Sequence, residues 1–546
     1  MKKDVKSAIA DILKQEGIEY VFGYTGGHIM QMWEAANNAG IKLILNKQEG
    51  NGVYMADAFV RLTKKPAVVL GTAGPGVTNM VTGLATSLLD SIPVIVIGAT
   101  VKSMAFGRNA TQDGSGRGRS TEQRLVFKAV CKQAMLAPRP EAVPMMVREA
   151  FRIALSGRPG PVYLEIPSDF WDKEIDYEPV NPNQYKNTNL PGCNRADIEM
   201  IIKKFYGSKH PMILIGEGAL EPNIQNRMME FLNKPKIPFG VSPLAKNIID
   251  EHHPLYLGVA RAAGETQRIY EYMRKSDFIL FLGDRMQAWE LNWHDQSLVE
   301  KAVLAQVDSD WDEIGRVFPI DYSAVGSILS FIDIFPRETH SNSRQLEKEV
   351  EDLNKKFPRE KRLKDGNGIN PLNINNIVEE LATDNATIVC DTGYAKSMAI
   401  MKFRTKLSQN FIVADKNGPM GYSVPAALGA ALATNKEVVC FSGDGGFQMS
   451  LNELGTALNY GLKVIYVVEN NGGCISIVDF HTSVYGHHCA DTFKNPDFAK
   501  IAEAYGMKGF TVKTTEEFEK AFRQAQKEKI SVIIDAKIDQ SLMVWE

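Results

Sequence analysis

The chain has 546 residues, of which 44 % are hydrophobic and 23 % are charged. This length and composition suit a globular protein of roughly three or four domains with about 150 residues each. The net charge of −3, from 62 basic and 65 acidic residues, shows no excess that would attract nucleic acid or an anionic membrane. No stretch reaches the ~18 apolar residues of a membrane span, and the N-terminus begins an amphipathic helical pattern rather than a signal peptide. We therefore expect a cytoplasmic protein that binds neither nucleic acid nor a membrane.

The six cysteines form no Cys-x-x-Cys pair, and several lie in apolar runs, as Cys440 does in Val-Val-Cys-Phe. Disulfide frameworks and zinc sites have paired spacings that are missing here. We expect buried thiols that neither form disulfides nor bind zinc.

Short apolar runs alternate with longer helical patterns along the chain, at 67–70, 94–97, 212–215, 278–282, 438–441 and 464–468. This alternation is typical of parallel sheets covered by helices on both faces. Polar stretches at 171–195 and 338–370 interrupt the alternation, and we expect linkers there. The sequence therefore predicts an α/β protein with three doubly wound parallel-sheet domains, at 1–175, 195–335 and 370–546.

In the first domain an acidic residue follows a predicted strand. The strand at 41–45 leads into Asn-Lys-Gln-Glu-Gly at 46–50, and a helical pattern begins near Glu49. A glutamate at a helix start is most often a capping residue or a partner of the helix dipole. Open parallel sheets, however, bind ligands beyond the carboxyl ends of their strands, which is where Glu49 lies.

Two strand ends in the third domain carry residues suited to phosphate and metal. The strand at 437–442 ends in Gly-Asp-Gly-Gly at 443–446. Residues without a Cβ let phosphate oxygens approach backbone N–H groups, and the Asp444 carboxylate is a hard ligand for Mg²⁺ or Ca²⁺. The next strand, at 463–469, ends at the same edge in Asn-Asn-Gly-Gly at 470–473. One carboxylate, one amide oxygen and a main-chain carbonyl can therefore surround a cation that also holds two phosphates.

The helix between these two strands begins near Ser450 and Glu453, whose spacing predicts a capping box. Either strand end alone is more often a structural turn. Gly-Asp-Gly followed after 24 residues by Asn-Asn, however, resembles the thiamine-diphosphate fingerprint. The resemblance implies that thiamine diphosphate binds with Mg²⁺, and that Asp444, the Asn471 side chain and the Gly473 carbonyl hold the metal.

Further motifs are similar, in order and spacing, to those of the acetolactate synthase family over nearly the whole chain. They are Phe-Gly-Tyr-Thr-Gly-Gly at 22–27, the segment around Glu49, Thr-Ala-Gly-Pro-Gly-Val-Thr-Asn at 72–79, Asp-Ser-Ile-Pro at 90–93, Ser-Gly-Arg-Pro-Gly-Pro-Val at 156–162 and Gly-Pro-Met-Gly-Tyr at 418–422. The resemblance implies a pyrimidine-binding, a central and a diphosphate-binding domain. It also implies a homodimer or homotetramer, because the cofactor bridges the first and third domains across a subunit interface.

The same resemblance implies roles for individual residues. Glu49 would hydrogen-bond the aminopyrimidine ring, so that the cofactor's own amino group can take the proton from its thiazolium carbon. Burial lets such a carboxyl share a proton at neutral pH. The Gly418 carbonyl and the Met420 amide would hold the aminopyrimidine, and Met449, which in isolation would be a core gap-filler, would support the bent cofactor. The residues near the diphosphate would be Gly393, Tyr394, Gly443, Asp444, Gly445 and Gly446.

Thiamine diphosphate stabilises the carbanion left when a bond to CO₂ or to another carbon breaks, and the protein selects donor and acceptor. Acetolactate synthases decarboxylate pyruvate and pass the two-carbon unit to a second 2-oxoacid. The resemblance thus implies a lyase or transferase with small 2-oxoacid or 2-hydroxycarbonyl substrates. One departure is His28, which stands where the family has Ala after Tyr-Pro-Gly-Gly. Its imidazole would lie beside the reacting carbon, as in the similar loop of benzaldehyde-lyase-like enzymes, where it handles protons.

Other segments that would face the substrate also depart from the family. Gln112 would supply the family's substrate-facing glutamine, although a Gly- and Arg-rich insertion follows it. After Asn471 the family pattern reaches a Trp that shapes the acceptor pocket, whereas this chain continues Gly-Gly-Cys-Ile-Ser. Two sets of side chains could serve the site or lie in solvated loops: the arginines 108, 117 and 119, which suit a carboxylate or phosphate, and the histidines 481, 487 and 488.

Acetolactate synthases hold a structural FAD in the central domain, and related CoA lyases hold a nucleotide there. Gly-Glu-Gly at 216–218 follows a predicted strand but lacks the third glycine of a dinucleotide fingerprint. The segments at 258–261 and 283–286 differ from the flavin-contacting pattern. These changes argue against FAD in the central domain. FAD or ADP there stays an open alternative.

Two further alternatives remain open from the sequence. A benzaldehyde-lyase-like or 2-hydroxyacyl-CoA-lyase-like enzyme would join or split C–C bonds without decarboxylation, and His28 favours it. A cofactor-binding subunit without catalysis would serve assembly or regulation, and the presence of Glu49 argues against it.

Overall fold

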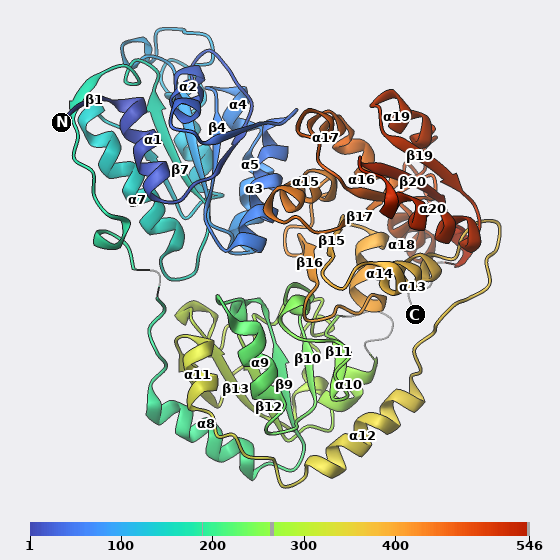
Figure 1. Ribbon diagram of the computed structural model, residues 1–546. Coiled ribbons are helices and arrows are strands. Elements are labelled where there is room, and N and C mark those ends of the chain that lie inside the picture. Colours follow the sequence, from blue (N-terminus) through green and yellow to red (C-terminus); the bar gives the residue numbers. More distant parts are fainter. Residues whose placement is uncertain (188, 262–266, 543–546) are drawn as a thin grey trace.

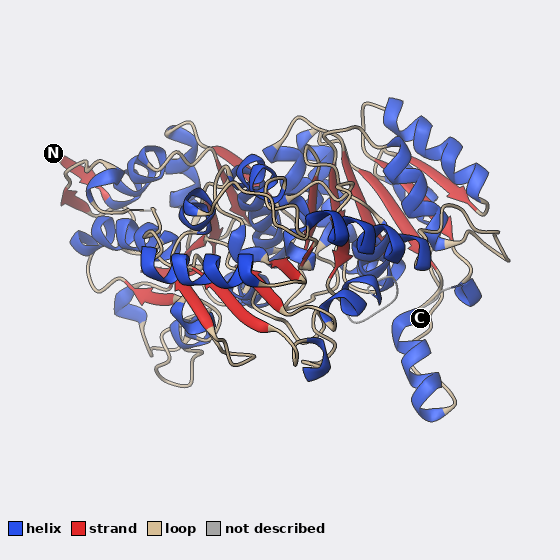
Figure 2. Ribbon diagram, turned by 90° about the horizontal axis from the view of Figure 1, so that it is seen from below, coloured by secondary structure: helices blue, strands red, loops and turns tan. Residues whose placement is uncertain are grey.

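The computed structural model describes residues 1–187, 189–261 and 267–542. They form three six-stranded parallel sheets with helices on both faces, which confirms the predicted fold class (Figures 1 and 2). A small antiparallel pair joins the N-terminal strand β1 (Lys2–Asp4) to β8 (Glu174–Asp176).

The first sheet has the strand order β3-β2-β4-β5-β7-β6. Its central strands β4 and β5 are buried at every residue and mostly apolar, because helices cover both faces and leave neither side to water. The strands are β2 (Tyr20–Gly23), β3 (Lys42–Leu45), β4 (Ala67–Gly71), β5 (Val94–Thr100), β6 (Gln133–Leu136) and β7 (Val162–Pro167). The helices are α1 (Val5–Gln15), α2 (Met30–Asn38), α3 (Glu49–Thr63), α4 (Pro75–Thr78), α5 (Val81–Leu89), α6 (Gln123–Lys128) and α7 (Val143–Leu155).

The central sheet has a different order, β11-β10-β9-β12-β13-β14, which is the order of dinucleotide-binding sheets. The strands are β9 (Pro211–Ile215), β10 (Phe239–Val241), β11 (Tyr256–Val259), β12 (Phe278–Leu282), β13 (Val303–Asp308) and β14 (Tyr322–Val325). The helices are α8 (Arg195–Gly207), α9 (Ile224–Leu232), α10 (Gln267–Met273), α11 (Ile328–Ile334) and α12 (Ser343–Lys356).

The third sheet, β16-β15-β17-β18-β20-β19, repeats the strand order of the first sheet. The strands are β15 (Thr387–Cys390), β16 (Asn410–Val413), β17 (Val438–Gly443), β18 (Ile465–Asn470), β19 (Lys508–Val512) and β20 (Val532–Lys537). The helices are α13 (Pro371–Leu381), α14 (Tyr394–Lys402), α15 (Ser423–Ala433), α16 (Asp444–Met449), α17 (Leu454–Tyr460), α18 (Ile475–Tyr485), α19 (Phe498–Ala504) and α20 (Thr515–Lys527).

The two stretches expected as linkers differ from each other. The stretch at 171–195 contains β8 and one short turn of helix before α8 begins. The stretch at 338–370 carries α12, whose Leu346, Val350 and Leu353 are buried against the core of the central sheet. Its high charge reflects the outward face of this amphipathic helix, which lies along the lower edge of the molecule in Figure 1.

The first and third sheets pack against each other through equivalent helices, α3 and α15. A Cβ on Gly429 of α15 would lie 2.1 Å from the carbonyl oxygen of Met55 on α3, so glycine permits the close approach. The Tyr422 hydroxyl donates to the buried Asp57 carboxylate across the same contact at 2.7 Å. One hydrophobic cluster therefore runs through both domains and fixes the carboxyl edges of their sheets relative to each other.

Candidate active site

The two motifs of the third domain meet at one edge of its sheet. Strands β17 and β18 are neighbours, with Gly443 opposite Glu469. The buried Asp444 carboxylate accepts hydrogen bonds at Oδ2 from the backbone N–H groups of Asn471, at 3.1 Å, and Gly472, at 2.6 Å. The side-chain oxygen of Asn471 lies 3.1 Å from the nitrogen of Gly473. The Asp444 carboxylate therefore touches the backbone of the Asn471 segment, and the Asn471 side chain touches Gly473, so carboxylate, amide and carbonyl oxygens of the kind that Mg²⁺ prefers lie at one sheet edge.

An open cradle lies beside this oxygen set. A Cβ on Gly393 or Gly443 would meet no atom within 4 Å, so both glycines border free space. Gly393 has φ +117°, which favours glycine, and precedes α14. Gly393 follows β15 and Gly443 ends β17. The order of the sheet reverses between these strands, which is where flavodoxin-like sheets bind phosphate. The cradle therefore fits a diphosphate.

Of the other residues expected at the diphosphate, Gly445 and Gly446 continue α16 beside the cradle, and Tyr394 begins α14. The Tyr394 ring is buried in a small cluster with Leu372, Met398 and Ile475. Its backbone, rather than its ring, therefore borders the cradle.

Sequence reasoning missed three polar residues around the cradle. The Asn495 side chain donates to Asp444 Oδ2 at 2.6 Å and to Asn470 at 2.8 Å. The buried Asp391 accepts from the Gly421 N–H at 2.9 Å and the Ser423 hydroxyl at 2.9 Å. Asp391 could have been found by its place directly after a strand, whereas nothing local marks Asn495.

Glu469, the third missed residue, is buried at the end of β18, and both of its carboxylate oxygens have no hydrogen-bond partner among the described residues. Burial, and secondarily the charge of Asp444, raises the pKa of Glu469 to about 8. Burial therefore favours the neutral form of the Glu469 carboxyl.

The loop expected to hold the aminopyrimidine lies against the cradle. Gly418 has φ +59° and leads to Met420, whose Cε lies 3.3 Å from where a Cβ on Gly445 would be. A Cβ on Gly421 would lie 2.9 Å from that of Met449. Met449 itself is 62 % exposed, which rules out the core gap-filling role that its helical spacing alone would suggest.

Glu49 begins α3 at the carboxyl edge of the first sheet. Its Oε2 accepts from the Asn79 side chain at 2.9 Å. A Cβ on Gly76 would lie 3.6 Å from the other carboxylate oxygen. The carboxylate is only half-buried within the single chain, so the burial expected for it would have to come from a bound cofactor or another subunit.

The predicted capping box of Ser450 and Glu453 is wrong. Ser450 makes no side-chain cap, and its hydroxyl instead donates to the Gly421 carbonyl at 2.7 Å. Buried Glu453 accepts from the backbone N–H groups of Lys47 and Gln48, at 2.9 and 3.1 Å, and from the Asn51 side chain at 3.0 Å. Glu453 therefore fastens the Glu49 segment to the third domain, and neither residue caps a helix.

His28 and Gln112 both lie at the carboxyl edge of the first sheet. His28 follows β2, its carbonyl accepts from the Trp171 indole N–H at 2.8 Å, and burial lowers the pKa of its imidazole. Gln112 adopts a left-handed backbone with φ +65° and packs on Gly74. It lines an open pocket of about 450 Å³ that Arg119 also lines. All three candidate arginines, 108, 117 and 119, are exposed.

Two of the three candidate histidines are held together. His481 and His488 contact Asp491 through Nδ1, at 3.0 and 2.7 Å, whereas His487 contacts the carbonyl of Tyr485 at 3.1 Å.

Residues Cys131, Cys193, Cys390 and Cys440 are buried free thiols as expected, but Cys489 is exposed. The part of the chain that the structure describes contains no group of three or more His, Cys, Asp or Glu that could hold a metal.

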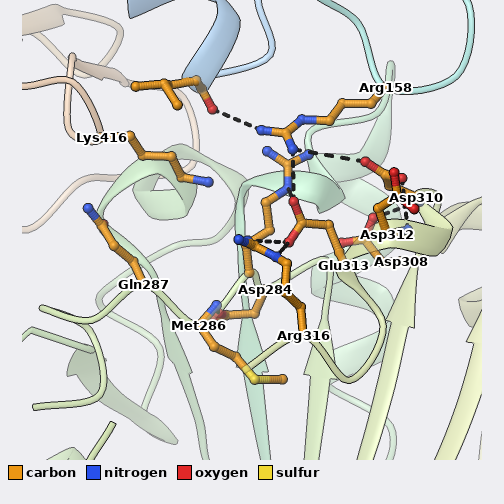
Figure 3. Close-up of polar contacts among 12 residues, drawn as sticks. Arg158, Asp284, Met286, Gln287, Asp308, Asp310, Asp312, Glu313, Arg316 and Lys416 are labelled. Carbon is orange, nitrogen blue, oxygen red and sulfur yellow. Dashed lines mark hydrogen bonds and ion pairs between the residues drawn. The ribbon is translucent and has the colours of Figure 1, made fainter. Parts of the chain in front are cut away.

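The carboxyl edge of the central sheet gathers acids that the sequence did not single out (Figure 3). Asp284 follows β12, Asp308 ends β13, and Glu290 lies close by, all fully or almost fully buried. Burial, and next the charge of Glu217, raises the pKa of Asp284 to about 7. Burial likewise raises the pKa of Asp308 to about 6 and that of Glu290 well above its usual range.

The raised pKa of Asp284 makes stability depend on pH. Its ordinary pKa is 3.8, so the folded protein holds this proton more tightly than the unfolded chain, and stability falls as pH rises from about 4 to about 7. In Asp284→Asn the side-chain oxygen should still accept from the Met286 N–H, which lies 2.7 Å from Asp284 Oδ1 in the wild type. Because asparagine does not ionise, the variant should not lose stability as the pH rises. We expect Tm to rise by about 2–4 °C near pH 8 and by clearly less near pH 5 in scanning calorimetry. An equal shift at both pH values would contradict this assignment.

Comparison with known proteins points to the same cofactor. Residues 3–116 match the family described as thiamine pyrophosphate enzyme, N-terminal TPP binding domain. Residues 198–334 match the central domain of the same enzymes, and residues 391–536 match their C-terminal TPP binding domain. The fold and site thus define a thiamine-diphosphate enzyme, with thiamine diphosphate and Mg²⁺ as cofactors.

Curated relatives match nearly the whole chain. The acetolactate synthase large subunit of Buchnera aphidicola is 30 % identical over 554 residues, which cover 98 % of this chain and 94 % of the relative. That of Haemophilus influenzae is 29 % identical over 553 residues, covering 98 % and 95 %. The probable acetolactate synthase large subunit of Methanococcus aeolicus is 28 % identical over 561 residues, covering 98 % and 92 %. The chain belongs to the acetolactate synthase family of thiamine-diphosphate enzymes.

Among the described residues, no helix has the length and apolar character needed to span a membrane.

Proposed function

We propose that this protein is a transferase or lyase that decarboxylates a small 2-oxoacid such as pyruvate and passes the two-carbon unit to an acceptor carbonyl. One observation carries the proposal. Glu453 accepts three hydrogen bonds from the 47–51 segment, so in each chain the Glu49 loop and the third-domain edge that carries Asp444 are held in fixed positions, from which two copies can build a site between them. The names of the relatives support the same reaction.

In this proposal each part of the site has one task. Asp444, Asn471 and the Gly473 carbonyl hold Mg²⁺, and the cradle of Gly393, Tyr394, Gly443, Gly445 and Gly446 holds the diphosphate. The Gly418 carbonyl, Met420 N–H and Met449 orient the aminopyrimidine, whose ring nitrogen receives a hydrogen bond from Glu49. His28 and Gln112 face the substrate, where neutral His28 can accept a proton and Gln112 can bind a carbonyl or hydroxyl oxygen.

The direct test supplies the purified protein with thiamine diphosphate and Mg²⁺ and measures CO₂ released from pyruvate and from a panel of 2-oxoacids. Acyloins and acyl-CoA compounds are assayed in parallel for cleavage to an aldehyde. CO₂ release with formation of a new C–C bond supports the proposal. Cleavage of acyloins without any CO₂ release would overturn it in favour of a benzaldehyde-lyase-like reaction.

We also propose that two copies associate, with the third domain of one chain facing the first domain of the other across the cofactor. Apolar side chains lie exposed near both edges of the site, as Tyr24 and Met449 do at 41 % and 62 % exposure. Helix α18, which follows the metal motif, exposes Phe480 and Tyr485, at 61 % and 65 %. Clustered apolar exposure of this kind indicates a surface that another protein covers.

Mixing two inactive variants tests this arrangement. In a dimer of Glu49→Gln with Asp444→Ala, sites formed across the interface include one with both residues intact. Random mixing makes half of the dimers mixed, so we expect about a quarter of wild-type activity after the variants are unfolded and refolded together. Each variant refolded alone is the control. A mixture no more active than the variants alone would mean that each chain completes its own site.

A further inference from the structure

The strand order of the central sheet marks a ligand position that the proposed reaction does not use. In sheets of this order, nucleotide phosphates bind where the order reverses, here between the ends of β9 and β12. The residues that follow β9 are Gly216, Glu217 and Gly218, and those that follow β12 are Gly283, Asp284 and Arg285.

In this chain that position is closed by the backbone. The Gly216 N–H donates to the Leu282 carbonyl at 2.9 Å, and the Gly218 N–H donates to the Gly283 carbonyl at 2.8 Å. A Cβ on Gly216 would lie 2.3 Å from the Cα of Asp284. The glycines thus allow two strand ends to touch, and their N–H groups are already used. The residues here do not fit the pyrophosphate of a flavin or dinucleotide.

A carboxylate of the chain itself occupies the same place. Glu217 is 6 % exposed and pairs with Lys416 of the third domain and, at 3.5 Å, with Arg285. Burial acts to raise the pKa of Glu217, but the charges of Lys416 and Arg285 outweigh it and hold the pKa below its usual value. An entering phosphate would meet this carboxylate and the acids Asp284 and Asp308.

The cations around Glu217 come from several domains. Arg285 donates to the Ser91 hydroxyl of the first domain at 2.9 Å, and Arg158 donates to the same hydroxyl at 2.8 Å. Arg158 also pairs with the buried Glu313 at 2.8 Å. Figure 3 shows Arg158 and Lys416 entering this cluster from different sides. The first, central and third domains therefore meet around buried charges.

Lys416 links this cluster to the cofactor site. It lies two residues before Gly418, in the loop expected to hold the aminopyrimidine. The neighbouring residues are anchored as well: Asp415 pairs with Lys396 at 3.0 Å and with Arg261 of the central domain at 3.2 Å. Asn417 donates to the Thr86 hydroxyl of the first domain at 2.9 Å. The 415–421 loop is thus held from all three domains, with Glu217 as the carboxylate that pairs with Lys416.

We propose that Glu217 is a built-in anion that takes the place of a nucleotide phosphate between β9 and β12, and that it is a positioning residue for the 415–421 loop of the thiamine-diphosphate site. The positioning part rests on the proposed function of that loop. A central domain closed in this way needs no flavin, and the purified protein should show no flavin absorbance.

Cofactor affinity tests the proposal without relying on turnover. Glu217→Ala leaves Lys416 and Arg285 without their carboxylate, and thiamine diphosphate should bind about tenfold to a hundredfold more weakly in calorimetric titration with Mg²⁺. Sodium formate should restore much of the affinity of this variant, whereas sodium chloride at equal ionic strength should not. Asp308→Asn is the matched control, because it changes a buried acid of the same edge that accepts from the Asp310 N–H. It should bind the cofactor like the wild type.

Wild-type affinity in folded Glu217→Ala, or equal effects of formate and chloride, would overturn the proposal. If Glu217→Ala does not fold, the double variant Glu217→Gln/Lys416→Gln removes both charges together and should fold. Its cofactor affinity should still be weak, and wild-type affinity there would also overturn the proposal. Failure of the wild-type protein to bind thiamine diphosphate would instead contradict the proposed function, so the two outcomes are distinct.

Discussion

Glu49→Gln should lower kcat by about 10²–10⁴-fold while thiamine diphosphate still binds. Glutamine keeps the size of the side chain and can still accept from Asn79, now at 2.9 Å, so the local packing should survive. It cannot give a proton to the ring nitrogen of the aminopyrimidine or take it back. The loss should therefore fall on turnover rather than on cofactor affinity.

Steady-state kinetics with the best 2-oxoacid of the panel, together with calorimetric cofactor titration, separates these two quantities. Glu19→Gln is the matched control, since Glu19 is a surface residue of the same domain that pairs with Lys65. An unchanged kcat in Glu49→Gln would support the alternative of a cofactor-binding subunit without catalysis.

Asp444→Ala should weaken Mg²⁺-dependent binding of thiamine diphosphate by about 100-fold or more. The variant removes the one carboxylate of the proposed metal set. It also removes the acceptor shared by the Gly472 N–H and the Asn495 side chain, at 2.6 Å each. Both the metal and the loop that surrounds it are therefore affected.

Titration of the cofactor at several Mg²⁺ concentrations measures this effect. Asp384→Ala, which removes an exposed acid of the same domain paired with Lys406, should behave like the wild type. If folded Asp444→Ala binds the cofactor with wild-type affinity and the same dependence on Mg²⁺, Asp444 is not a metal ligand.

The sequence predicts the fold, and the position of the candidate residues at the sheet edges, because both depend on local patterns. Buried strands appear as continuous apolar runs, so the strand expected at 278–282 is β12 with the same bounds. Residues that follow such runs lie at the carboxyl edge of a parallel sheet, which places Glu49, Asp444 and Asn471 without knowledge of the packing.

Contacts between distant segments could not be predicted in the same way. The spacing of Ser450 and Glu453 fits a helix cap, yet Glu453 bonds to a segment about 400 residues away. Asn495 acts through contacts that only the assembled sheet creates. The repeated strand order of the first and third sheets, which makes α3 and α15 equivalent partners, is likewise a property of the folded chain.

Exchange of the thiazolium C2 proton of bound thiamine diphosphate tests the central claim most directly, because it needs no knowledge of the substrate. Protein, cofactor and Mg²⁺ are mixed with D₂O, quenched in acid and examined by proton NMR. We predict that the wild-type protein exchanges this proton at least about 100-fold faster than free cofactor does, and that Glu49→Gln loses the acceleration. Exchange at the rate of free cofactor in the wild-type complex would contradict the account.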